Sequence, residues 1–159
     1  TAVGVAVDPQ HNAVYVSGDT NGEIGGKSNS GGFDGFLMRL DRSGNQKWAR
    51  EFGTSSNDMT FSVDVRHSTG DVYVAGRSEG KFGGKTNKGG FDLATAKFDS
   101  SGQMQWRRLE GSGQDERPND IVVDQKTDDF YIGGWTEGDL PSSANNMGQR
   151  DAFVMRRKD

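Results

Sequence analysis

The sequence predicts an all-β fold of three tandem four-stranded antiparallel repeats, the last of them incomplete. A shift of 58 residues reveals the repeat, because residues 1–53 and 59–111 then share 21 identical positions. Short runs rich in β-branched and aromatic residues alternate with Gly, Asn, Asp and Ser, as in strands joined by turns. No segment shows convincing 3.6-residue periodicity, so we expect almost no helix.

The repeats divide the chain into residues 1–58, 59–116 and 117–159. Each complete copy contains four short strands, and the third copy contains three. The expected strands are Val3–Asp8, Ala13–Gly18, Gly35–Asp41, Lys47–Phe52, Phe61–Arg66, Asp71–Gly76, Leu93–Asp99, Gln105–Leu109, Asp120–Asp124, Asp129–Gly134 and Ala152–Arg157. Four antiparallel strands in a repeat of this length are typical of a β-propeller blade.

The turns and the long loops support this organisation. Asp41 and Gly44, like Asp99 and Gly102, occupy the first and fourth positions of a turn between two strands. This pattern indicates a tight hairpin in which the Asp side chain caps the turn and Gly takes a positive φ. The Gly-rich loops 22–33 and 80–91 are expected to lie on one rim, where repeat proteins bind their partners.

Aromatic residues recur at equivalent places in the copies. Trp48 and Trp106 match, as do Tyr15, Tyr73 and Tyr131. A four-stranded sheet cannot bury both of its faces alone, so these residues are expected to pack one blade on the next, with both tryptophans largely buried. The alternative is that the aromatic rings stack on a ligand.

These motifs resemble the bacterial β-propeller repeat known as the SBBP repeat. The residues that carry the resemblance are Asp34, Phe36, Arg39, Asp41, Gly44, Trp48, Gly53, Tyr15 and Gly18 in copy one, Asp92, Lys97, Asp99, Gly102, Trp106, Gly111, Tyr73 and Gly76 in copy two, and Asp151, Phe153, Arg156, Tyr131 and Gly134 in copy three. The sequence departs from the pattern at Ala94, Met147 and Gln149. The resemblance implies a propeller within a large, secreted or cell-surface protein, and it implies no activity.

Composition excludes several classes of protein. No run approaches the ~18 apolar residues that a membrane-spanning helix needs. The net charge is −4 and the one cationic cluster is 156–158, so a nucleic-acid surface is not expected. The chain has no cysteine, which removes disulfides and thiolate chemistry. His11 and His67 fall at non-equivalent positions and are expected to be solvated loop residues rather than a metal pair.

One short motif suggests an enzyme. The segment Gly76–Gly80 fits the G-x-S-x-G pattern of a nucleophile elbow, with Ser78 as the candidate nucleophile. However, no helix is expected after it, and the other copies carry Thr20 and Thr136 at the same place. The motif is therefore interpreted as a repeated turn, and no catalytic residue is assigned.

Aspartates follow the Gly-rich loops in all three copies, at Asp34, Asp92 and Asp151. Together with Asn29, Asn87 and loop carbonyls, Asp34 and Asp92 could bind calcium, which prefers clustered oxygen ligands. In the favoured alternative, each Asp accepts backbone N–H bonds and fixes its loop against the strand. No cofactor other than this possible calcium is expected.

The function predicted from these features is a non-catalytic module for protein–protein interaction or scaffolding. A glycan-binding propeller is the alternative, and an enzyme with a site where blades meet is the least favoured class. Because fewer than three complete blades cannot close a propeller, we expect either a longer parent protein or an assembly of several chains to complete the ring.

Overall fold

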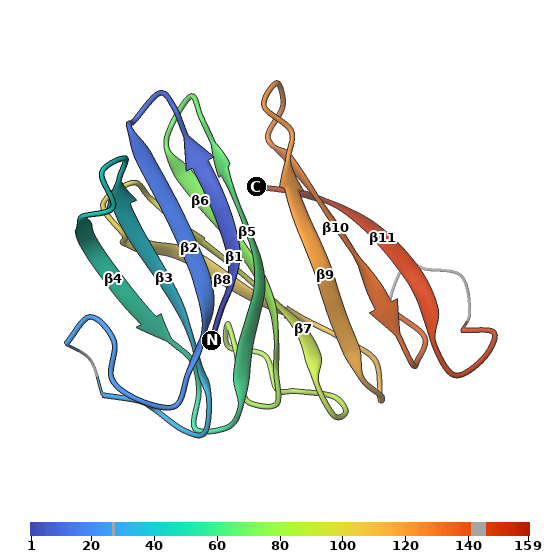
Figure 1. Cartoon of the computed structure of the whole chain (residues 1–159). Helices are drawn as coiled ribbons and strands as arrows, with labels where there is room; N and C mark the ends of the chain where they lie inside the picture. Colours follow the sequence, from blue (N-terminus) through green and yellow to red (C-terminus); the bar gives the residue numbers. More distant parts are fainter. Residues whose placement is uncertain (27, 141–145) are drawn as a thin grey trace.

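The computed structural model describes residues 1–26, 28–140 and 146–159. Residue 27 of the predicted loop 22–33 and residues 141–145 of the third repeat lie outside the described residues. Eleven strands and no helix are present in the described chain (Figure 1). They are β1 (Ala2–Asp8), β2 (Ala13–Thr20), β3 (Asp34–Asp41), β4 (Gln46–Phe52), β5 (Asp58–Arg66), β6 (Asp71–Ser78), β7 (Asp92–Phe98), β8 (Met104–Glu110), β9 (Glu116–Val123), β10 (Asp129–Thr136) and β11 (Asp151–Lys158).

The strands form three antiparallel sheets in sequence order, which confirms the predicted all-β class and the grouping of the strands into antiparallel sheets of four, four and three. The first sheet is β1-β2-β3-β4, the second is β5-β6-β7-β8, and the third is β9-β10-β11. None of the sheets closes on itself. They lie side by side along the molecule (Figure 1).

Most strands extend one to three residues beyond the predicted bounds. For example, β2 continues to Thr20 because Thr20 pairs with Asp34, the first residue of β3. Ser78 and Asp92 form the equivalent pair at the end of the second hairpin. Sequence patterns place strand ends poorly, since pairing can continue into polar residues that also look like turn residues.

The turns have the predicted geometry. Gly44 and Gly102 adopt φ values of 84° and 82°, in the left-handed region that favours glycine. The backbone N–H of each glycine donates to the carbonyl oxygen of the Asp that opens the turn, over 3.0 Å at Asp41 and 2.9 Å at Asp99. The Asp side chain accepts further backbone N–H groups from the same turn.

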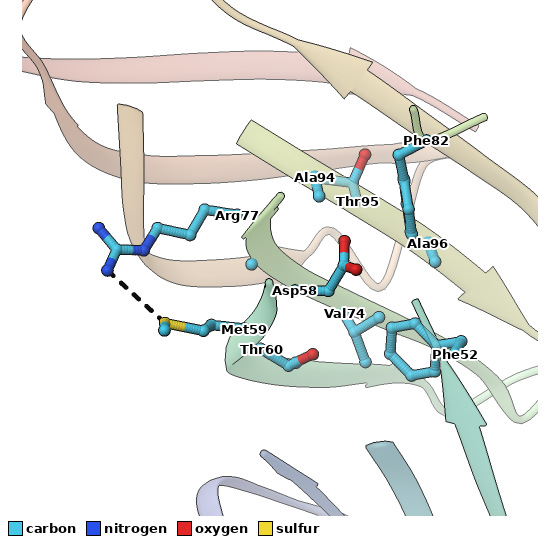
Figure 2. A pocket seen from close by; sticks show the side chains of 11 residues that line it. Phe52, Asp58, Met59, Thr60, Val74, Arg77, Phe82, Ala94, Thr95 and Ala96 are labelled. Carbon is cyan, nitrogen blue, oxygen red and sulfur yellow. Dashed lines mark hydrogen bonds between the residues drawn. The ribbon is translucent and has the colours of Figure 1, made fainter. Parts of the chain in front are cut away.

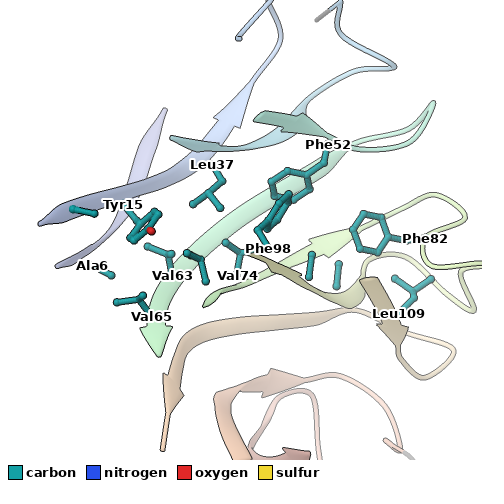
Figure 3. Packing of buried hydrophobic residues seen from close by; sticks show 14 residues of the cluster. Ala6, Tyr15, Leu37, Phe52, Val63, Val65, Val74, Phe82, Phe98 and Leu109 are labelled. Atoms are coloured by element: carbon teal, nitrogen blue, oxygen red, sulfur yellow. The ribbon is translucent and has the colours of Figure 1, made fainter. Parts of the chain in front are cut away.

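Two hydrophobic clusters join the sheets face to face. The first lies between the first and second sheets, where Tyr15, Leu37 and Phe52 meet Val63 and Phe98 (Figure 3). The second lies between the second and third sheets, and its members are Tyr73, Ala75, Leu93, Ile121, Val123, Phe130, Ile132, Leu140, Phe153 and Met155. Each sheet therefore buries apolar side chains against its neighbour, since a single sheet cannot cover its own faces.

The expected burial of the two tryptophans needs correction. Trp48 and Trp106 are half-buried, and each packs against the edge of one of the two hydrophobic clusters. Their strands, β4 and β8, are the outer edges of their sheets, so one side of each indole stays open to solvent. Both rings still contact the repeated tyrosines, with centroids 6.0 Å apart at Tyr15 and at Tyr73.

Candidate functional site at the loop rim

The three longest loops emerge from the same end of the three sheets. Residues 21–33 join β2 to β3, residues 79–91 join β6 to β7, and residues 137–150 join β10 to β11. The described parts of these loops lie toward the lower end of the molecule in Figure 1. We call this surface the rim. Loops held by a rigid sheet are common places for binding residues.

An asparagine holds each rim loop in shape. Asn87 donates from Nδ2 to the carbonyl oxygen of Ser78 over 2.8 Å, and its Oδ1 accepts the Gly89 N–H over 2.9 Å. Asn29 and Asn146 make the same two kinds of bond in their own loops. The amide groups are therefore engaged inside the protein rather than facing a ligand.

The aspartates predicted as possible calcium ligands serve the same loops. Asp34 Oδ2 accepts the Ser30 N–H over 2.6 Å, and Asp92 Oδ2 accepts the Lys88 N–H over 3.0 Å. Asp151 accepts a backbone N–H four residues earlier in the third loop. Asp34 and Asp92 are fully or almost fully buried. Buried carboxylates that accept loop N–H groups are what we expect if each Asp serves to fix its loop against the strand.

A second acid that the sequence analysis did not single out faces Asp34 across the first sheet boundary. Asp58, at the start of β5, is 4% exposed and accepts the N–H and the hydroxyl of Thr54. A Cβ on Gly53 would lie 2.2 Å from Asp34 Oδ1 and 3.0 Å from Asp58 Oδ2, so only glycine fits beside the two carboxylates. Burial raises the pKa of Asp58, and the charge of Asp34 raises it further.

The same arrangement recurs at the second boundary. A Cβ on Gly111 would lie 2.3 Å from Asp92 Oδ1 and 2.6 Å from Glu116 Oε2. Glu116 is fully buried and accepts the hydroxyls of Ser112 and Thr136 over 2.5 and 2.8 Å. Burial raises the pKa of Asp92, and the nearby Glu116 charge raises it further. The sequence signal was a carboxylic residue five positions after each repeated glycine.

These acid pairs do not form a complete metal site. In the described parts of the chain, no group of three or more His, Cys, Asp or Glu side chains is placed to hold a metal ion. Calcium takes about six to eight oxygen ligands, whereas each boundary supplies two carboxylates that already accept hydrogen bonds. Calcium at Asp34 and Asp92 stays a prediction.

A narrow internal cavity lies beside the first acid pair. Figure 2 shows it lined by Asp58, Thr60 and Thr95 together with the rings of Phe52 and Phe82. It has room for about one water molecule, so it is too small for a substrate. The cavity belongs to the packing between sheets rather than to a binding site.

The candidate nucleophile is enclosed in a turn. Ser78 is fully buried, and its Oγ accepts the Gly80 N–H over 3.1 Å. Thr20 and Thr136 make the same bond to the glycine two residues later. Residues 79–91 form a loop containing one isolated bridge, and β7 follows it, so the strand-to-helix geometry of a nucleophile elbow is not formed.

The two histidines lie in the turns that join β1 to β2 and β5 to β6, whereas the rim loops follow β2 and β6 at the other end of those hairpins. His11 sits in the turn after β1, and its Nδ1 lies 2.7 Å from Asp8 Oδ2. His67 follows β5, and its backbone N–H donates to the side chain of Gln125. The two histidines thus lie in different hairpin turns, and the His67 backbone bonds across the second boundary to the turn after β9.

The Asn and Asp residues that hold the loops recur in every copy, whereas other side chains at the rim differ from one copy to the next. Beside the middle loop, the guanidinium of Arg77, near the end of β6, lies 3.9 Å from the ring centroid of Phe91 and 5.6 Å from that of Phe61. The Arg117 guanidinium lies 4.6 Å from the Phe61 ring on the opposite sheet. Burial lowers the pKa of Arg77, and the charge of Arg117 lowers it further.

The other loops place different residue types at the same two positions. Beside the third loop, Trp135 of β10 packs against Arg150, whose guanidinium lies 4.2 Å from the indole centroid. The equivalent residues beside the first loop are Asp19, in β2, and the exposed Phe33. Beside Trp135, an open hollow is lined by Gln114, Glu137, Gln149 and Arg150. One backbone frame therefore presents three different surfaces.

Comparison with known proteins adds no assignment. No family model matches the chain, and no curated protein matches it significantly. The described residues contain no helix that is long and apolar enough to cross a membrane.

Proposed function

We propose that the three sheets are consecutive blades of a β-propeller of the SBBP-repeat type. Three features support this. The strands of each sheet follow in sequence order, the sheets stack face to face, and equivalent residues pack at both boundaries. Sheets arranged radially in this way would form a propeller once further blades complete the ring. The SBBP resemblance also favours a protein of the cell surface or the extracellular space.

The proposed function is non-catalytic protein–protein interaction or scaffolding through the rim. The observation that carries it is the contrast between constant supports and variable surface residues. The Asn and Asp residues that shape the loops recur in every copy, whereas the partly or fully exposed pairs beside the loops are Asp19–Phe33, Arg77–Phe91 and Trp135–Arg150. A protein partner presents an irregular surface, and aromatic and Arg side chains are enriched where such surfaces bind.

Glycan binding is the competing class, and it calls for a polar site repeated in every blade. The repeated polar groups here are the Asn and Asp side chains, and their bonds lie within the loops. This leaves fewer donors and acceptors for a sugar. Catalysis has no candidate group under this proposal, because the Ser78 hydroxyl is buried and bonded.

The test is affinity capture from the source organism, run with the unmodified chain and with Trp135→Ala and Phe91→Ala. The matched control is Met104→Ala, which changes an exposed hydrophobic residue on the outer strand β8, outside the rim. A protein retained by the unmodified chain and by the control, but lost with the rim variants, supports the proposal. Binding to a glycan array with no protein retained would replace it with the lectin alternative.

A further inference from the structure

The outer surface of the first sheet is an uncovered apolar face. Side chains on this face fall in two rows, because Val5 pairs with Val16 and Val16 with Met38, while Val7 pairs with Val14 and Val14 with Leu40. Val5 is 66% exposed and Val7 is 48% exposed. We call these six residues the valine face. In Figure 1, no other sheet covers it.

The second sheet carries the same two rows, and there they are buried. The equivalent residues all belong to the cluster that joins the second sheet to the first, and their exposed fractions are between 0% and 6%. They are Val63, Val65, Val72, Val74, Ala96 and Phe98. The valine face of the first sheet thus has the chemistry of a surface that packs on another sheet.

The other end of the stack shows the complementary surface. On the outer side of the third sheet, Val122 pairs with Tyr131 and Tyr131 with Arg156, and Val154 lies on the adjacent row. Tyr131 is 39% exposed and Val154 is 78% exposed. We call these four residues the tyrosine face.

Equivalent tyrosine faces are covered on the other two sheets. Tyr15 on the first sheet and Tyr73 on the second are fully buried, as is Leu37, the equivalent of Val154. In each case the cover is the valine-type face of the next sheet. The chain therefore packs a tyrosine-type face on a valine-type face at both internal boundaries. It leaves the valine face uncovered on the first sheet and the tyrosine face uncovered on the third.

We propose that the valine face of one copy of this chain binds the tyrosine face of a second copy, head to tail. The support is continuity with the two internal boundaries, which join the same two surfaces in the same order. Such a contact is heterologous, so copies would close into a ring or continue as a chain. This inference does not depend on the function proposed for the rim.

The contact between copies is expected to be weaker than the internal boundaries. The described residues of the third sheet include no equivalent of Trp48 and Trp106, which cover the tyrosines of the first two sheets. Less apolar area is then removed from water when the tyrosine face is covered. Association should therefore depend on concentration rather than persist at all dilutions.

Sedimentation velocity and light scattering of the 159-residue chain over a wide concentration range test the proposal. We expect species heavier than 17.2 kDa at high concentration. Val5→Glu and Val154→Glu should each weaken association at least tenfold, because each places a charge in the contact. Met147→Glu, at a loop residue that is 92% exposed, is the control and should associate normally. Matching thermal melts establish that the variants fold.

Mixing the two variants gives the sharpest outcome. Val5→Glu keeps an intact tyrosine face and Val154→Glu keeps an intact valine face, so an equimolar mixture should form dimers and nothing larger. A monomer at every concentration would overturn the proposal. Undiminished self-association of Val154→Glu alone would also overturn it, because valine faces would then be pairing with each other.

Discussion

The two sheet boundaries use equivalent residues but different acceptors. At the first boundary, the Trp48 indole N–H donates over 3.2 Å to the backbone carbonyl of Ser100. At the second, the Trp106 indole N–H donates over 2.9 Å to the carboxylate of Asp159, which also accepts the Tyr73 hydroxyl. The repeat thus fixes where the indole lies, while its acceptor can be a backbone or a side-chain oxygen.

Charge is the main difference between the boundaries. Among the residues that the structure describes, the ion pairs Arg66–Asp128, Lys97–Asp159 and Arg157–Glu110 cross the second boundary, and none crosses the first. At the first boundary, Arg50 instead donates to the carbonyl oxygens of Ser101 and Gly102. We expect the second boundary to respond more strongly to side-chain substitution and to salt.

The largest effect should come from adding a methyl group between the buried acids. Gly53→Ala and Gly111→Ala place a Cβ about 2.2–2.3 Å from a carboxylate of Asp34 or Asp92. Each should cost about 1–3 kcal/mol of unfolding free energy in urea melts, because a packed site has to shift. Gly113→Ala, where nothing lies within 4 Å, is the control. Equal stability of all three variants would show that the pairs are not tightly packed.

The difference in acceptors leads to a second prediction. Asp159→Ala removes the acceptor shared by Tyr73 and Trp106 and should destabilise the second boundary by about 1–3 kcal/mol, with a red shift of Trp106 fluorescence. Ser100→Ala should have little effect at the first boundary, because the acceptor there is a backbone oxygen. Similar losses in the two variants would mean that the hydrogen bond is not what distinguishes the boundaries.

The buried hydroxyls should contribute about equally at the two boundaries. Ser78→Ala removes the bond to Gly80, and Thr136→Val removes bonds to Gly138 and to Glu116. We expect each variant to lose about 1 kcal/mol of unfolding free energy. A fluorophosphonate probe should leave Ser78 unlabelled. Covalent labelling of Ser78 would instead establish a nucleophile and refute the non-catalytic interpretation.

The acid pairs should also give a distinctive pH dependence. Because burial raises the folded-state pKa of Asp58 and Asp92, their protonation stabilises the fold below the ordinary carboxyl pKa of about 4, and this stabilisation is lost as pH rises through the raised pKa values. The free energy of unfolding of Asp58→Asn should therefore rise relative to that of the unmodified chain as the pH increases from 4 to 7. Urea melts across this range measure the change.

Asp99→Asn is the control of opposite sign. Hydrogen bonds from Ser101 and the turn backbone lower the pKa of Asp99, so its contribution is present above about pH 4 and is lost as pH falls. The free energy of unfolding of Asp99→Asn should therefore rise relative to that of the unmodified chain as the pH falls. Parallel pH profiles for both variants would contradict the assignment of raised and lowered pKa values.

The smallest expected effect is that of chelation. If Asp34 and Asp92 serve only to hold their loops, the melting temperature should be the same with EDTA and with added calcium. A melting temperature that rises with calcium would establish binding by the folded chain. Asp34→Asn and Asp92→Asn would then show which boundary holds the ion.

Much of the fold could be predicted because it rests on local rules. Short runs of β-branched and aromatic residues between turn residues identified all eleven strands, and the Asp41–Gly44 pattern predicted both the hairpin and the positive φ of its glycine. The extent of tryptophan burial could not be predicted in the same way. Whether Trp48 is covered depends on the neighbouring sheet, whose turn at Ser100 lies 52 residues away along the chain.

For the candidate site, the sequence by itself determined the repeat, its turns and the recurrence of Asp34 and Asp92, because hydrogen bonds within a loop need only nearby residues. Only the tertiary structure decided that Asp34 faces Asp58, and that Arg77 lies against the rings of Phe61 and Phe91. These contacts depend on how one sheet stacks on the next or how a loop folds back on its strands. Stacking is driven by burial of apolar area, which is non-directional, so the pattern of one repeat does not specify which polar groups it brings together.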